Sequence, residues 1–344
     1  MKQIFFMLAL LAMMTLMGCK DSNDEPDPNK QPRIYVAIID DHYNSYVYDI
    51  EGNTIYECPQ YSQIIKLASE GKNWYAVRSR HDDNNYNTVL YEVLKNGTVQ
   101  FQIPYAAEGM CVENGDVYTL QHDKNYDNYF IYKNDQQLYR YDAYDYDFAY
   151  NSFDVVDGHL VAGIRGAWSS PSYWIDGKKL TLDINSTSSQ MSMEAYAREG
   201  TDDLFVIRDD DDERIWYQFK GQSHHLPSAY IVSQAMIVDG DSYILALNRD
   251  LDQALLYMNG YKYTLNRPLR DGDEYQSWRG MMRRYGNDVY VLTNTWGKHS
   301  QIYKRNEPID MSARIELRYV AGDDEHEKPL SDCGITDFIV LPPK

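Results

Sequence analysis

The chain has 344 residues and a formal net charge of −19. Such a field repels phosphate backbones and anionic lipid surfaces, so the charge argues against a nucleic-acid-binding protein. The 32 tyrosines are the compositional oddity, because tyrosine suits half-exposed strand faces and flat surfaces that stack on sugar rings or peptide side chains.

Residues 1–18 are predicted to be a signal peptide. They carry one positive charge, at Lys2, and an apolar run from Ile4 to Met17 that is too short for a comfortable transmembrane helix. Leu16-Met17-Gly18-Cys19 resembles the lipobox of bacterial lipoproteins, in which a small residue precedes a cysteine that is lipidated. The resemblance implies that Cys19 becomes the first residue of the mature chain and anchors it in a membrane. An ordinary secretory signal that is cut elsewhere is the alternative.

Residues 19–32 form a predicted flexible tether, since they are polar, acidic and proline-bearing and offer nothing from which to build a core. Within the tether, Lys20-Asp21 with Asp24-Glu25 resembles the short acidic export signal of surface lipoproteins in the Bacteroidota. That resemblance implies a lipid-anchored protein of the outer membrane that faces the outside of the cell rather than the periplasm.

Residues 33–344 contain a repeat. Each unit has an apolar strand that ends in a glycine-containing turn, a second apolar strand, a variable polar loop, a tyrosine-bearing strand, a second tight turn and a short fourth strand. Four antiparallel strands repeated radially, with a period of about 43 residues, are typical of propeller blades. The marker tyrosines, 40 to 46 residues apart, are Tyr48, Tyr91, Tyr132, Tyr173, Tyr217, Tyr257 and Tyr303.

The two ends of the repeat region predict how the ring closes. The first repeat begins at Arg33 without an opening strand, and Cys333–Leu341 supplies an opening strand with no successor. We therefore predict an all-β fold in one domain: a seven-bladed β-propeller of four-stranded antiparallel blades, closed by a mixed blade of three N-terminal strands and one C-terminal strand. One long insertion falls near residues 319–332. A ring of six or eight blades, two β-sandwiches and an open β-solenoid are the alternatives.

The loops between the second and third strands, and those crossing between blades, are predicted to gather on one face of the disc. They are longer than the other turns and richer in aromatic, arginine, histidine and aspartate residues, the side chains from which sugar and peptide sites are built. The alternative is that these residues only make local salt bridges or hold one blade to the next. The candidate ligand- or partner-binding residues are His42, Tyr61, Arg80, His81, Tyr105, His122, Tyr146, Arg165, Trp168, Arg208, Arg249, Tyr275, Trp278 and Trp296.

Neither a metal nor a cofactor is expected. With Cys19 lipidated, Cys58, Cys111 and Cys333 remain, and no CxxC or His-Cys spacing indicates zinc. The acidic run Asp209–Glu213 lacks the spacing of a calcium loop and is predicted to be a solvated hairpin tip. No GxSxG, HExxH or phosphate-cradling glycine loop is present in the sequence.

The lipobox, the acidic tether and the closed propeller together resemble the auxiliary surface lipoproteins of SusC/SusD-type nutrient importers. The resemblance implies a non-catalytic surface lipoprotein that binds a glycan or peptide, or docks on an outer-membrane transporter. A propeller enzyme, either a polysaccharide lyase or a glycoside hydrolase, is the alternative, with His81, His122, Arg165 and Arg208 as its catalytic candidates. A purely structural subunit is a third possibility.

Overall fold

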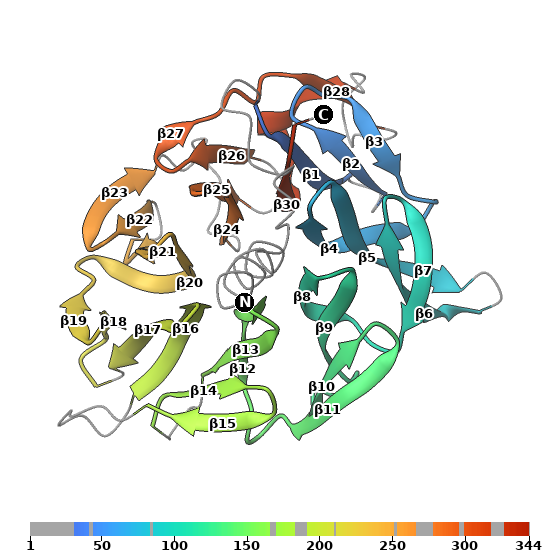
Figure 1. Cartoon of the computed structure of the whole chain (residues 1–344). Helices are drawn as coiled ribbons and strands as arrows, with labels where there is room; N and C mark the ends of the chain where they lie inside the picture. The colour runs from blue at the N-terminus through green and yellow to red at the C-terminus, as the bar shows by residue number, and fades with distance from the viewer. Residues whose placement is uncertain are drawn as a thin grey trace, which may run out of the picture.

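The computed structural model describes residues 31–40, 44–82, 85–165, 170–182, 191–209, 211–250, 253–265, 278–295, 299–317 and 327–343. Seven four-stranded antiparallel sheets stand around a central axis, and the chain visits them in sequence order (Figure 1). The predicted seven-bladed propeller is therefore confirmed. Each marker tyrosine lies in the third strand of its blade, counted from the axis outward.

We number the blades 1 to 7 from the N-terminus and give each from its inner to its outer strand. Blade 1 contains β30 (Ile335–Leu341), β1 (Arg33–Ile39), β2 (Ser45–Asp49) and β3 (Thr54–Glu57). Blade 2 contains β4 (Ser62–Glu70), β5 (Asn73–Asp82), β6 (Asn85–Lys95) and β7 (Thr98–Ile103). Blade 3 contains β8 (Ala107–Glu113), β9 (Asp116–His122), β10 (Asn128–Lys133) and β11 (Gln136–Asp142). Blade 4 contains β12 (Phe148–Val156), β13 (His159–Ile164), β14 (Ser172–Ile175) and β15 (Lys178–Thr181).

The remaining blades follow the same order. Blade 5 contains β16 (Met191–Glu199), β17 (Asp202–Asp209), β18 (Arg214–Phe219) and β19 (Gln222–His225). Blade 6 contains β20 (Ala229–Val238), β21 (Asp241–Asn248), β22 (Ala254–Met258) and β23 (Tyr261–Leu265). Blade 7 contains β24 (Trp278–Tyr285), β25 (Asp288–Thr295), β26 (His299–Lys304) and β27 (Glu307–Pro308).

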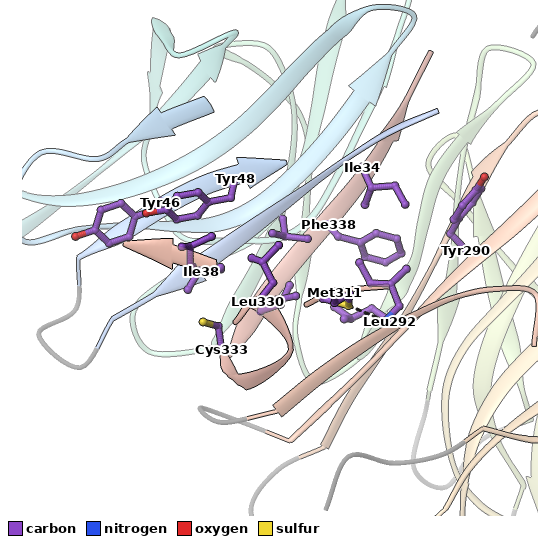
Figure 2. Close-up of a cluster of buried hydrophobic side chains, with 14 of the residues drawn as sticks. Ile34, Ile38, Tyr46, Tyr48, Tyr290, Leu292, Met311, Leu330, Cys333 and Phe338 are labelled. Atoms are coloured by element: carbon purple, nitrogen blue, oxygen red, sulfur yellow. Dashed lines mark hydrogen bonds between the residues drawn. The ribbon is translucent and has the colours of Figure 1, made fainter. Parts of the chain in front are cut away.

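The ring closes in blade 1 as the sequence predicted. The C-terminal strand β30 pairs with β1 along its length, from Arg33 opposite Leu341 to Ile38 opposite Ile335. Figure 2 shows the apolar side chains that gather at this closure, among them Ile34, Phe338 and Leu292. Because the first and last strands share one sheet, the ladder between β1 and β30 closes the ring.

The connection from blade 7 back to β30 is longer than the others and has structure of its own. It contains a two-stranded sheet, β28 (Arg314–Glu316) with β29 (Glu327–Pro329), followed by a single 3-10 turn, η1 (Leu330–Asp332). The hydroxyl of Tyr48 donates to the carbonyl of Glu316 at 2.5 Å. Met311, Leu330 and Cys333 pack into the closure cluster, so the insertion covers the joint between blades 7 and 1.

The core is divided among the joints between blades. Seven clusters of buried apolar side chains occupy the described residues, and each lies between one pair of neighbouring blades. In β1, Ile34, Val36 and Ile38 pack toward blade 7 while Tyr35 and Ala37 pack toward blade 2. A strand buried on both faces has no polar side, which explains the continuous apolar runs of the second strands.

Strand direction alternates within each blade, so the disc has two unlike faces. We call the loop face the one that carries the loops between second and third strands and the crossovers between blades. The opposite turn face carries the tight turns, and glutamates at the ends of inner strands bind the next blade there. Glu70 accepts from the Gly115 amide at 2.8 Å, Glu113 from the Gly158 amide at 3.0 Å, and Glu199 from the Gly240 amide at 2.9 Å.

Candidate functional site

Six of the sequence-predicted site residues lie outside the described residues or lack a described side chain. Cys19, His42, Trp168, Tyr275 and Trp296 fall in undescribed segments, as do the signal peptide and nearly all of the tether. Trp278 begins β24, and its side chain is likewise not described.

Several residues expected in loops are strand residues instead. Arg80 and His81 lie in β5, His122 ends β9, Arg208 lies in β17 and Trp278 begins β24. Their backbones continue the ladder, as His81 pairs with Val89, and His122 with Tyr129. Polar side chains are tolerated at these strand ends because the strands reach the rim of the loop face there, and the sequence pattern alone mistook them for loop residues.

In blade 2 the rim is held by a buried ion network. The Arg78 guanidinium donates to Glu92 Oε2 from Nε at 3.1 Å and to the Tyr56 hydroxyl of blade 1 at 2.6 Å. Arg80 Nε donates to Glu92 Oε1 at 3.0 Å. Burial raises the pKa of Glu92, but the hydrogen bonds from Arg78 and Arg80 outweigh burial and hold this pKa below its usual value. The network joins blades 1 and 2, so Arg80 has a structural role.

In blades 3 and 5 a β-bulge in the inner strand places a glutamate against a basic residue of the second strand. Glu108 lies in the bulge of β8, and its Oε1 is 3.0 Å from Nε2 of the buried His122 without forming an aligned hydrogen bond. Glu194 lies in the equivalent bulge of β16 and accepts from Arg208 Nε at 2.6 Å. Bulges re-aim side chains next to functional rims.

A second group of basic residues surrounds Tyr230 at the start of β20. The guanidinium carbons of Arg208 and Arg249 lie 5.7 and 5.5 Å from the centre of its ring, and Arg208 also donates to its carbonyl. Arg249 pairs with Glu213 of the acidic run. In blade 4 the exposed Arg165 lies beside Asp147, whose pKa is raised by burial and partly lowered again by the arginine.

Exposed tyrosines gather on the loop face of blades 2 to 4. Of the four strongly exposed tyrosines among the described residues, Tyr61, Tyr126 and Tyr144 lie on this face, with exposures of 56%, 64% and 96%, and Tyr261 lies on the turn face. Tyr105 stacks on Phe130 with ring centres 5.0 Å apart, and Tyr146 packs on Tyr141 at 4.4 Å. We call the set on the loop face the tyrosine arc: Tyr61, Tyr105, Tyr126, Tyr144 and Tyr146.

Two tyrosines of the arc have strained backbones. Tyr61 and Tyr126 adopt positive φ angles of 58° and 61°, in the left-handed region that bulky residues rarely enter. Such a conformation costs about 1–2 kcal/mol for an L-residue that is not glycine. Tyr126 regains part of this by packing on His122, whose ring centre is 3.9 Å away. No ring contact of Tyr61 is found among the described residues.

None of the candidate residues named from the sequence lines the second concave region, the central channel. Its inner-strand lining encloses about 600 Å³ and includes Asp154, which no motif singled out. An alignment of the seven repeats could have singled out Asp154, because the equivalent residue is uncharged in most of the other repeats. A shallower groove of about 570 Å³ runs along β18 and β19 and brings together His224, His225 and the acidic run; its lining residues are Asp209, Asp212, Arg214, Trp216, Ser223, His224 and His225.

Within the described residues, no group of three or more His, Cys, Asp or Glu side chains is placed to hold a metal ion. Cys58, Cys111 and Cys333 are buried cysteines, and burial raises the pKa of the Cys58 thiol to about 12. The described part of the chain also contains no helix with the length and hydropathy needed to span a membrane.

By architecture the chain is a seven-bladed propeller protein with a tyrosine-rich loop face. No family model and no curated protein matches it. Among solved structures, the β-propeller domain of the Trilobed protease from Pyrococcus furiosus is 10% identical with a TM-score of 0.42, over 80% of this chain and 97% of that chain. The WD40 domain of Toxoplasma gondii coronin is 10% identical with a TM-score of 0.45, over 91% of this chain and 86% of that chain.

Proposed function

We propose that this chain is a non-catalytic surface lipoprotein, anchored in the outer membrane through Cys19, that binds a glycan or a peptide through its tyrosine arc. The binding serves nutrient uptake as an accessory of a SusC/SusD-type importer. The observation that carries the proposal is the exposure of Tyr61, Tyr126 and Tyr144 on one face of the disc, two of them at positive φ. Flat aromatic faces stack on sugar rings and peptide side chains.

The strain supports a binding role over a structural one. A tyrosine held at positive φ and left more than half exposed costs stability without a matching gain from burial, as at Tyr61. Backbone strain of this kind concentrates at functional sites, where the surrounding structure holds it in place. Tyr105 and Tyr146 extend the same surface while their rings are fixed against Phe130 and Tyr141, which lowers the entropy lost on binding.

The enzymatic alternative receives less support. Its four candidates His81, His122, Arg165 and Arg208 belong to blades 2, 3, 4 and 5, one to each blade. His122 and Arg208 contact Glu108 and Glu194 of their own blades, rather than converging with the others on one pocket. Catalytic groups are expected to converge and to have strongly shifted pKa values.

The test compares the full chain with the triple variant Tyr61→Gly, Tyr126→Gly and Tyr144→Ala on an array of glycans and peptides. We expect the triple variant to lose at least about tenfold in affinity, since aromatic contacts at binding surfaces contribute about 1–3 kcal/mol each. Tyr261→Ala removes an equally exposed tyrosine from the turn face and should bind like the parent chain. Equal binding by all three proteins, or depolymerisation of a glycan by the parent chain, contradicts the proposal.

Tyr61→Gly alone separates binding from folding. Glycine adopts positive φ freely, so we expect the single variant to be at least as stable as the parent chain in urea denaturation while its affinity falls. A variant that loses both stability and affinity would instead mark Tyr61 as a structural residue. Purification from outer membranes in mild detergent, followed by identification of any barrel transporter that accompanies the chain, tests the importer part of the proposal.

A further inference from the structure

The inner strands of all seven blades stand around the central axis (Figure 1). Residues of all seven line a central channel that encloses about 600 Å³. This volume lies in the range of pockets that hold small molecules. Several ionisable residues of five blades line it, all in inner strands except Asp157, which lies in the turn after β12: Lys66, Glu108, Asp154, Asp157, Arg198, Glu199, Arg283 and Arg284.

Ladder register identifies one ring of equivalent residues in this lining. In blade 4 the last inner-strand pair is Val156 with His159, and Asp154 stands two residues before it. The same count from the last pair of every other blade gives mostly apolar residues. The complete ring is Ala68, Cys111, Asp154, Ala197, Met236, Arg283 and Ile339, and all of these line the cavity.

Arg283, the cation of this ring, is already held by other groups. Its NH2 group binds Asp337 Oδ1 at 2.5 Å, and its Nε donates to the Phe338 carbonyl at 3.0 Å. The neighbouring channel arginines are paired as well, Arg198 with Asp203 at 3.3 Å and Arg284 with Glu199 at 2.6 Å. Arg283 and Arg284 therefore bind groups of other blades and Arg198 binds a group of its own blade, while Asp154 is the carboxylate of the ring.

Asp154 follows an irregularity of several residues in β12, longer than the bulges of the other inner strands. Ladder pairing in β12 jumps from Ala149 to Asp154, while the partner strand advances only from Gly163 to Val161. Oδ1 accepts from the amide of Val155 at 2.8 Å, and no partner of Oδ2 is found among the described residues. The side chain is open to the channel, yet the blades surround it on every side.

The side chain of Asp154 is exposed to the channel and enclosed by the surrounding blades. The pKa of Asp154 is raised to about 6: the surrounding blades raise it most, the Val155 amide and the charges of Arg283 and Arg284 lower it, and the charge of Glu113 raises it. The carboxylate is thus ionised at neutral pH at a cost that a positively charged ligand would offset.

We propose that the channel binds a small organic cation, a primary ammonium group on a short apolar chain, with the ammonium donating to the Asp154 carboxylate. The apolar chain lies against Ala197, Met236 and Ile339 of the same ring. The ring supplies one carboxylate, which is enough for an ammonium donor, whereas a metal ion needs several oxygen ligands. This site is separate from the tyrosine arc and does not rest on the function proposed above.

The test measures binding of n-butylammonium to the full chain by calorimetry and by saturation-transfer NMR, with n-butanol as the neutral probe. We expect n-butylammonium to bind the parent chain and Asp154→Asn to weaken it by about tenfold or more, the loss of one charged hydrogen bond. Asp135→Asn makes the same charge change in the exposed outer turn between β10 and β11, outside the channel lining, and should leave the affinity unchanged.

The pH dependence provides a second readout. An alkylammonium stays charged throughout, so its affinity should fall as the pH is lowered through about 6, where Asp154 gains its proton. Asp154→Asn should abolish that fall, and its unfolding temperature at pH 7 should be no lower than that of the parent chain, because the raised pKa of Asp154 means that folding disfavours its charged form. Absence of n-butylammonium binding, equal binding of n-butanol, or unchanged binding by Asp154→Asn overturns the proposal.

Discussion

At the scale of single residues, the second turn of the blades has a recurring cap. Asn134 adopts a φ of 55°, and its Oδ1 accepts from the backbone amide of Val117 at 2.9 Å. Asparagine is among the few residues that tolerate this conformation, and its side chain also satisfies a donor at the start of the second strand. The same arrangement occurs at Asn96 with Trp74, Asp176 with Leu160 and Asn259 with Ser242.

We therefore expect Asn134→Ala to lower the free energy of unfolding by about 3 kcal/mol, from left-handed strain and the loss of two side-chain hydrogen bonds, one from the Val117 amide and one to Asp116 Oδ1. Asn134→Gly also removes the side-chain hydrogen bonding, but glycine adopts the positive φ without strain. This variant should therefore lose roughly half as much free energy of unfolding as Asn134→Ala. Urea denaturation of both variants measures the difference. If alanine proves no worse than glycine, the strain at this turn is not a determinant of stability.

At the scale of single elements, the pair β5 and β6 depends on the carboxylate of Glu92. Glu92→Gln leaves the nearly buried Arg78 without its charged partner, for which we expect a loss of about 3 kcal/mol at pH 7. The pKa of Glu92 is lowered in the folded chain, so its contribution is present above the unfolded pKa of about 4.3 and fades as the pH falls further. The stability gap between parent and variant should therefore narrow in acid. A gap that stays constant from pH 7 to pH 3 would show that the charge of Glu92 does not contribute.

The elements also show how far the sequence could predict the fold and the site. Blade number, strand order and ring closure follow from the tyrosine period and from the unpaired first and last strands, as at Arg33 and Leu341. The ends of the strands were harder to predict from the sequence. Arg80 and His122 are polar, as loop residues are, and only the strand pairing shows that β5 and β9 continue through them. Asp154 could not be found because its place depends on a bulge, and a bulge is set by how backbones meet in space.

At the scale of the whole molecule, one carboxylate joins three blades where the ring closes. Asp337 in β30 is 1% exposed and accepts from the amide of Leu67 in blade 2 at 2.8 Å and from Arg283 in blade 7. Its Oδ1 also accepts from the amide of Phe338 at 2.8 Å. Because a propeller buries its apolar faces only between neighbouring blades, this contact should affect the stability of the entire ring.

A double-mutant cycle at this joint tests that expectation. Asp337→Asn retains an acceptor for Leu67 but leaves Arg283 unpaired, so we expect it to cost about 3 kcal/mol, while Arg283→Met costs less. The double variant should lose less than the sum of the two, by about 1–3 kcal/mol. The exposed pair Asp288 and Arg305, 3.6 Å apart on the turn face, serves as the control and should couple by less than about 0.5 kcal/mol. Additive losses at Asp337 and Arg283 would mean that their pairing does not stabilise the closed ring, and that the closure depends on the β1–β30 ladder and its apolar cluster alone.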